Sequence, residues 1–205
     1  MAALLATAPA AAMLALPSAG HAAEGRIDEV AAALRGISTL HADFTQIDRN
    51  GRSVTGELTL KRPGRIRFQY EKSVPMLIVG DGKALTVIDY QVRQVQRWPI
   101  GNSPLGALLD PKRDIAKYAR EVPTGNGNVT SLEVHDAKHP EYGTITLIFT
   151  RNGGAPGGWQ LDSWVALDAQ SNRTLIRLSH QRYGAAVSDD AFRFVDPRPA
   201  VHRAG

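Results

Sequence analysis

Two histidines a short distance apart are the first residues in this sequence that could bind a metal. His135 and His139 have the spacing that brings two imidazoles onto one face when the segment is an α-helix. Pro140 follows His139 directly, and the flanking residues have the character of strand ends. We therefore predict that the pair lies in a surface turn and that the protein binds no metal.

Adjacent carboxylates and hydroxyls in strands are the other residues that could support catalysis. Asp189 and Asp190 follow Ser188, a good helix N-cap, so this pair is expected to open a short turn. Ser163 and Ser179 fall in segments with strand character, and no Gly-x-Ser-x-Gly sequence is present to expose a nucleophile. Catalytic residues that come together only in the folded structure need no sequence motif, so this alternative stays open. We predict that the protein is not an enzyme and uses no cofactor.

The formal net charge is +4, and the basic residues have one local concentration at Lys61, Arg62, Arg65 and Arg67. Nucleic-acid-binding proteins carry such charge, but neither a basic helix nor an alternation of aromatic and basic residues occurs in this sequence. We therefore predict no nucleic-acid binding. The basic cluster is interpreted as a solvated strand face, which is also suited to anionic membranes or acidic partners.

The elements that position these residues follow from the period of the polarity pattern. One amphipathic helix is predicted at residues 26–34, where Ile27, Val30, Ala31 and Leu34 form a single apolar stripe. After this helix the polarity alternates with a period of two, which is typical of strands. The predicted strands are residues 40–45, 56–61, 66–71, 76–79, 85–88, 91–97, 131–134, 144–150, 159–167, 174–183 and 192–194.

A helical insertion near residues 103–119 interrupts the predicted strands, with Ser103 as a suitable N-cap and Pro104 at the first helical position. A sheet of ten or eleven strands with one apolar face must cover that face, and the predicted helices are few and short. We therefore predict a mainly β fold. It is an unclosed antiparallel β-barrel with an N-terminal helix and a short helical lid over an apolar cavity.

The N-terminal segment has the pattern of a secretory signal. Residues 1–22 contain no Asp, Glu, Lys or Arg, and an apolar stretch is followed by Pro17 and the small residues Gly20 and Ala22. We predict a signal peptide at residues 1–22 and a single domain at residues 23–205, with no apolar run of transmembrane length in that domain. The absence of cysteine excludes disulfides and a lipid-modified N-terminal cysteine.

An ordered set of short sequences resembles the LolA family of outer-membrane lipoprotein carriers. The set spans nearly all of the predicted domain, and its order and spacing make it more specific than any one piece. The pieces are Phe44-Thr45-Gln46, residues 56–70, residues 77–85, Asp89-Tyr90, Gln94-Val95, residues 102–109 and residues 192–197.

This resemblance implies a periplasmic carrier with a helical lid over an apolar interior, and we expect a monomer. It implies three partners: acylated lipoproteins, an inner-membrane lipoprotein-releasing ABC transporter and an outer-membrane lipoprotein receptor. In the family, the arginine of the Arg-Pro step is held to backbone groups of the lid in the closed state, which makes Arg62 the predicted lid latch. A LolA-like lipid-binding regulator and a carrier of another lipid are alternatives that stay open.

Acyl binding requires an apolar surface, so inward-facing apolar and aromatic residues are the candidates for the cavity wall. For each of them, ordinary core packing is an equally good interpretation. The candidates are Phe44, Leu58, Leu60, Phe68, Tyr70, Met76, Ile78, Trp98, Leu105, Leu108, Phe149, Trp164, Ile176 and Leu178.

The first testable prediction concerns export. Expressed with its full leader in a Gram-negative host, the protein should be recovered from the periplasm with an N-terminus near Ala23 or Glu24, because the uncharged leader is cleaved. N-terminal sequencing of the purified protein checks this. Soluble protein that still begins at Met1 contradicts it.

Overall fold

A computed structural model describes residues 19–102, 105–109 and 114–199. In these residues eleven strands form one sheet, in the order β6-β5-β4-β3-β2-β1-β11-β10-β9-β8-β7. The strands are β1 (Thr39–Ile47), β2 (Ser53–Lys61), β3 (Arg65–Tyr70), β4 (Met76–Asp81), β5 (Ala84–Asp89), β6 (Gln94–Pro99), β7 (Ala119–Val122), β8 (Val129–His135), β9 (Thr144–Arg151), β10 (Trp159–Leu167) and β11 (Arg173–Tyr183).

The helical elements are an N-terminal α-helix, a short α-helix after β6, and five 3-10 helices. The predicted N-terminal helix is confirmed and is longer than expected. The bounds are α1 (Ala19–Gly36), η1 (Ile100–Asn102), α2 (Gly106–Leu109), η2 (Ile115–Lys117), η3 (Pro140–Tyr142), η4 (Pro156–Gly158) and η5 (Asp189–Phe192). Among the described helices, none combines the length and the apolar character needed to cross a membrane.

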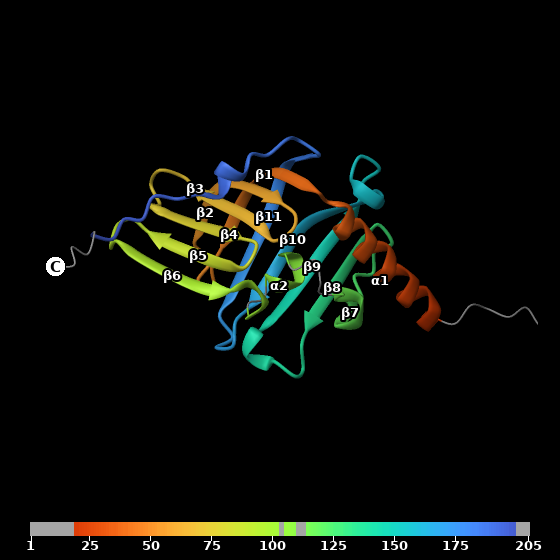
Figure 1. Cartoon of the computed structure of the whole chain (residues 1–205). Coiled ribbons are helices and arrows are strands. Elements are labelled where there is room, and N and C mark those ends of the chain that lie inside the picture. The colour runs from red at the N-terminus through yellow and green to blue at the C-terminus, as the bar shows by residue number, and fades with distance from the viewer. Residues whose placement is uncertain (1–18, 103–104, 110–113, 200–205) are drawn as a thin grey trace, which may run out of the picture.

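Every neighbouring pair in the sheet is antiparallel, and the pairing of β1 with β11 joins the first and last strands of the chain. The order ends at β6 on one side and β7 on the other, so the predicted mainly β, unclosed architecture is confirmed. Figure 1 shows the strands β2 to β6 and the strands β7 to β10 as two halves, with α2 between them. The open edges of the sheet are therefore β6 and β7.

Two β-bulges in neighbouring strands accompany the curvature of the sheet. The register of β1 with β11 shifts between His41 and Asp43, and the register of β10 with β9 shifts between Leu161 and Ser163. Gln181, in the bulged part of β11, donates a side-chain hydrogen bond to the carbonyl of Leu161, with an N–O distance of 2.7 Å. Because a bulge bends its strand and increases its twist, these two positions help the sheet to curl.

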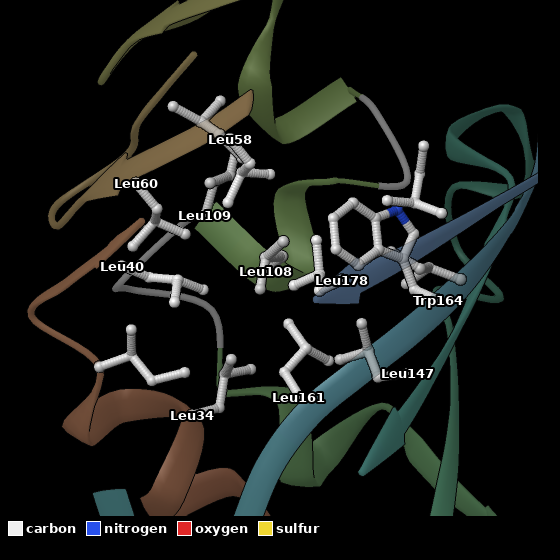
Figure 2. Close-up of a cluster of buried hydrophobic side chains, with 14 of the residues drawn as sticks. Leu34, Leu40, Leu58, Leu60, Leu108, Leu109, Leu147, Leu161, Trp164 and Leu178 are labelled. Atoms are coloured by element: carbon white, nitrogen blue, oxygen red, sulfur yellow. The ribbon is translucent and has the colours of Figure 1, made fainter. Parts of the chain in front are cut away.

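The core lies on the inner face of the curled sheet. In β3 the alternate residues Ile66, Phe68 and Tyr70 are buried, which is the pattern of a strand with one covered face. Figure 2 shows Leu108 and Leu109 of α2 among leucines from several other elements. The predicted stripe of α1 is used in the same way, because Val30, Ala31 and Leu34 are buried and Ile27 packs against this core at the margin.

The C-terminal segment lies on the outer face of the sheet, where Figure 1 shows it in blue beside the β2–β6 half. The predicted strand at residues 192–194 is wrong: Phe192 ends η5, and no strand follows it in the described residues up to 199. Phe192 is buried against Leu77, Val79 and Ile88 in a second apolar cluster. Alternation predicted a strand because every second residue is apolar, but the side chain of Phe192 packs onto the sheet from outside.

The basic cluster holds this C-terminal segment in place. Lys61 Nζ lies 2.6 Å from Asp189 Oδ1, and Arg65 binds the same carboxylate. The hydrogen bond from Lys61 and the charge of Arg65 lower the pKa of Asp189. Arg67 donates to the backbone carbonyls of residues 191 and 193. The interpretation of the cluster as a freely solvated strand face is therefore wrong.

The last described helix of the predicted insertion is η2, which ends at Lys117, and β7 begins at Ala119. The strand β7 was not predicted, since its four residues are too few for a clear alternation. Ser103 and Pro104, the predicted start of the insertion, lie outside the described residues. The same holds for residues 1–18 of the predicted signal peptide.

Gly56 provides a stability test of the aromatic packing. A Cβ atom at Gly56 would lie 2.2 Å from the carbonyl oxygen of Gln69 and 2.7 Å from a ring carbon of Phe44. We expect Gly56→Ala to lower the free energy of unfolding by about 1–3 kcal/mol, because the ring or the strand has to move. Chemical denaturation checks this, with Gly127→Ala as the control, since a Cβ there meets no atom within 4 Å. Equal stability of the two variants contradicts the prediction.

Candidate functional site

A cavity of about 650 Å³ lies between the two halves of the sheet. Its walls come from the strands β3 to β6 on one side and from β10 and β11 on the other. Leu105, which directly precedes α2, and Tyr142 of η3 also contribute to the wall. Ligand pockets commonly have volumes of about 300–1,000 Å³, so this cavity has the size of a binding site.

Eight of the fourteen predicted cavity residues line this space, and whether they bind an acyl chain stays a prediction. These eight are Phe68, Tyr70, Met76, Ile78, Trp98, Leu105, Trp164 and Ile176. The other six are buried in the core and do not border the cavity. They are Phe44, Leu58, Leu60, Leu108, Phe149 and Leu178.

Aromatic rings support the cavity wall across the sheet. Phe44 lies behind it and makes edge-to-face contacts with Phe68 and Tyr70, with ring centroids 5.3 and 5.2 Å apart. Phe68 in turn meets Trp164 of β10 at 6.2 Å, so the rings reach from β3 to the other half. Trp98 on the edge strand β6 is 42% exposed, which places it at the open margin of the cavity. Such ring pairs fix the wall because they prefer this geometry.

The polar residues of the cavity wall were not predicted. Four of them gather at one end, where β1 ends and the β10–β11 turn begins: Gln46, Asp168, Gln170 and Thr174. Alternation could have identified Gln46, because it follows Phe44 by two residues on the same strand face. The turn residues carry no such signal, since their position depends on how far the two halves of the sheet curl toward each other.

Two of these polar residues have specific partners. The hydroxyl of Tyr70 donates to Gln46 Oε1 at 2.6 Å, and burial raises the pKa of Tyr70, so the hydroxyl stays a neutral donor. Asp168 accepts hydrogen bonds from the backbone of its own turn, at Gln170 and Asn172. The side chain of Asn172 bonds to Asp168 as well and lowers its pKa. The turn is therefore held together by an ionised carboxylate.

The short helices after β6 form the predicted lid segment, of which Leu105 borders the cavity, and Arg62 contacts α2. Arg62 Nη2 donates to the backbone carbonyl of Leu108 in α2, with an N–O distance of 2.9 Å. Burial lowers the pKa of Arg62, and the nearby charge of Arg35 lowers it further. Figure 2 shows Leu108 and Leu109 between leucines of the surrounding elements. The position of Arg62 beside the lid backbone suits a latch, and its role in opening stays a prediction.

The lid also reaches the opposite half of the sheet, because η1 contacts η3 in the loop between β8 and β9. In η3, Glu141 borders the cavity, and His139 Nδ1 lies 3.1 Å from its carboxylate. The ring of Tyr142, which also borders the cavity, stacks on His139 with centroids 4.6 Å apart. These contacts link the two margins of the sheet over the cavity.

The other residues considered for chemistry do not border this cavity. His135 ends β8 and bonds to Thr144, whereas His139 belongs to the surface loop. Ser188 caps η5 as predicted, by accepting from the backbone N–H of Asp190. Within the described ranges, no group of three or more His, Cys, Asp or Glu side chains is arranged to hold a metal.

Comparisons with known proteins agree with the resemblance found in the sequence. Residues 35–195 match the family model described as outer membrane lipoprotein carrier protein LolA. An outer-membrane lipoprotein carrier protein of Chromobacterium violaceum is 31% identical over 204 residues, which cover 95% of this chain and 93% of the relative. One from Dechloromonas aromatica is 31% identical over 194 residues, or 90% and 89% of the two chains.

Among solved structures, a LolA superfamily protein from Nitrosomonas europaea aligns with a TM-score of 0.47 and 10% sequence identity. That alignment covers 84% of this chain and 97% of the other. The family model spans most of the described residues, and the two relatives match over nearly their full lengths. The chain therefore belongs to the LolA family of outer membrane lipoprotein carrier proteins.

Proposed function

We propose that this protein is a periplasmic carrier that binds the acyl chains of lipoproteins in the cavity beneath its lid. The observation that carries the proposal is the lined cavity of about 650 Å³ between the two halves of the sheet. Most of its wall is apolar or aromatic, and its described polar residues lie mainly at one end. Such a space suits a ligand with a long apolar part and a polar end.

The energy of acyl burial supports a carrier that works without covalent chemistry. Each methylene removed from water contributes about 0.8 kcal/mol, so ten buried methylenes contribute roughly 8 kcal/mol. This is enough to keep an acyl chain out of water during transit. It also opposes release, so a carrier needs a part that moves and offsets the binding energy.

The lid suits that role. The hydrogen bond from Arg62 to the carbonyl of Leu108 stabilises the closed position of α2. Hydrogen bonds that involve a charged group contribute about 1.5–3 kcal/mol. A ligand that needs the lid open must work against this bond, and closure of the lid after release recovers it. The latch therefore limits the affinity for cargo and favours transfer.

The family and the predicted leader support the proposed route. The relatives from Chromobacterium violaceum and Dechloromonas aromatica are named outer-membrane lipoprotein carrier proteins. By analogy, the protein accepts acylated lipoproteins from an inner-membrane lipoprotein-releasing ABC transporter and delivers them to an outer-membrane lipoprotein receptor. Both partners are part of the proposal.

Competition with lipopeptides tests the binding step. The purified protein should bind an environment-sensitive apolar probe with roughly one-to-one stoichiometry, because one cavity holds it. An acylated lipopeptide should displace the probe, and the same peptide without acyl chains should not. Probe fluorescence during titration measures both. Absence of a probe signal from folded protein, or equal competition by both peptides, would overturn the proposed function.

The latch has a test of its own. We expect Arg62→Leu to bind lipopeptide about tenfold more tightly and to release it less readily by a similar factor, because the closed empty state loses its charged hydrogen bond. The variant should therefore retain acylated cargo when it is purified from the periplasm. Binding titrations and a transfer assay to receptor-containing fractions measure the two effects.

Arg52→Leu is the control for loss of a positive charge, because Arg52 is exposed in the turn after β1 and pairs with Asp48. It should load and release like the unmodified protein. Unchanged loading and unchanged release in Arg62→Leu would leave Arg62 as a residue of structural importance only.

A further inference from the structure

We propose that Gln46 recognises the carbonyl group that joins an acyl chain to its head group, so that the cavity prefers ester-linked chains to ether-linked chains of equal length. This inference rests on the proposed acyl-binding function and adds a residue that determines specificity. The starting point is the position of Gln46 on the inner face of β1, where it borders a mostly apolar cavity.

The side chain of Gln46 is oriented by a buried partner. The hydroxyl of Tyr70 donates to Gln46 Oε1 at 2.6 Å. Tyr70 is itself fixed, because it is 3% exposed and its ring meets the edge of Phe44 with centroids 5.2 Å apart. The amide oxygen of Gln46 is thus occupied, and the amide nitrogen has to lie on the other side of the group.

The amide nitrogen therefore offers donors to the cavity. A glutamine amide has two N–H donors, and in the described part of the chain no hydrogen bond leads from Nε2 of Gln46 to a protein acceptor. When a ligand displaces water from this N–H group, the loss of the hydrogen bond to water costs free energy unless a ligand acceptor replaces it. A carbonyl oxygen of the ligand is such an acceptor.

The strand register places Gln46 at the depth where a linkage carbonyl is expected. Gln46 pairs with Ile176, which borders the cavity, and Thr174 and the β10–β11 turn lie farther toward the polar end. The apolar wall around Phe68 and Leu85 extends in the other direction. A chain that enters tail first places its methylenes against this wall and its linkage beside Gln46.

The acidic residues of the same wall cannot take this role. Asp168 and Glu141 border the cavity. Hydrogen bonds lower the pKa of each carboxyl group below its ordinary value, so both are ionised at neutral pH. An ionised carboxylate has no proton to donate, and these two already accept hydrogen bonds from their own loops. Gln46 is the residue of this wall whose oriented amide combines free donors with a fixed position.

Two lipopeptides that differ only in the linkage test the proposal. Both carry the same acetylated peptide on a cysteine with two C16 chains on its glyceryl group, joined by esters in one and by ethers in the other. The unmodified protein should bind the ester form about two- to tenfold more tightly, the range expected for one hydrogen bond. Displacement of the apolar probe measures both affinities on the full mature protein.

Substitutions at Gln46 should remove this preference. Gln46→Met keeps the approximate shape of the side chain and lacks the donors, so the ester-to-ether ratio should fall to about one. Gln46→Glu keeps an oxygen for Tyr70 and also lacks the donors, so its ratio should fall in the same way. Gln91→Met is the matched control, because Gln91 lies in the exposed turn between β5 and β6 and does not border the cavity, and it should keep the original ratio.

Tyr70 acts as a positioning residue, and Tyr70→Phe separates this role from packing. The variant keeps the aromatic contacts but lets the Gln46 amide rotate, so the ester-to-ether ratio should fall toward one. A purely structural role would lower both affinities together and leave the ratio intact. An equal affinity of the unmodified protein for the two lipopeptides, or a ratio that survives in Gln46→Met, would overturn this inference alone. Failure of both lipopeptides to bind would overturn the proposed function as well.

Discussion

Removing one face of an eleven-stranded antiparallel sheet from water is the constraint on which the other features of this fold depend. The chain has one long helix and several very short ones with which to cover that face. The sheet therefore curls and brings its own two halves together. One bulge lies where β1 pairs with β11 near Asp43, and another where β10 pairs with β9 near Leu161. Curling leaves a space between the halves that is wider than a packed core, and Leu105, directly before α2, borders this space.

The β2–β3 hairpin connects the two sides of the sheet. On the outer side, Lys61 and Arg65 bind Asp189 and hold the C-terminal segment. On the inner side, the same hairpin carries Arg62, which reaches the carbonyl of Leu108 in the lid. Residues with the same charge thus have different partners, because Lys61 and Arg65 belong to the strands and Arg62 lies in the turn between them. The outer contacts steady the hairpin from which Arg62 holds the lid.

Much of this fold could be predicted from the sequence, because period-two alternation marks strands that have one covered face. The unclosed sheet and the first helix follow from it. The alternation pattern does not show which segments pack against each face of the sheet. Phe192 looked like a strand residue although it packs from outside, and β7 was too short to give a pattern. Only the folded chain shows that the basic cluster has an acidic partner more than a hundred residues away.

The candidate site was harder to predict than the fold, and the reason is geometric. Alternation tells which side chains point inward, but the distance across the curled sheet decides whether an inward side chain meets a neighbour or borders the cavity. Phe44 and Gln46 lie on the same face of β1, yet Phe44 meets two rings and is buried, whereas Gln46 borders the cavity. The predicted wall contains apolar and aromatic residues because acyl binding requires an apolar surface, and this requirement carries no information about polar residues.

A wholly apolar cavity would suit a carrier poorly, because it would not orient the ligand. Hydrophobic binding grows with the buried area and has little direction, so such a cavity would hold any long chain at any depth. Polar groups at one end give the ligand an orientation, because the linkage and head group lose hydrogen bonds if they enter the apolar part. With Gln46 held by Tyr70 at the polar end and apolar residues such as Leu105 elsewhere in the wall, the two parts of the cavity differ in chemistry. In the function that we propose, the lid acts on a ligand whose position is fixed, so that one hydrogen bond at Arg62 influences release.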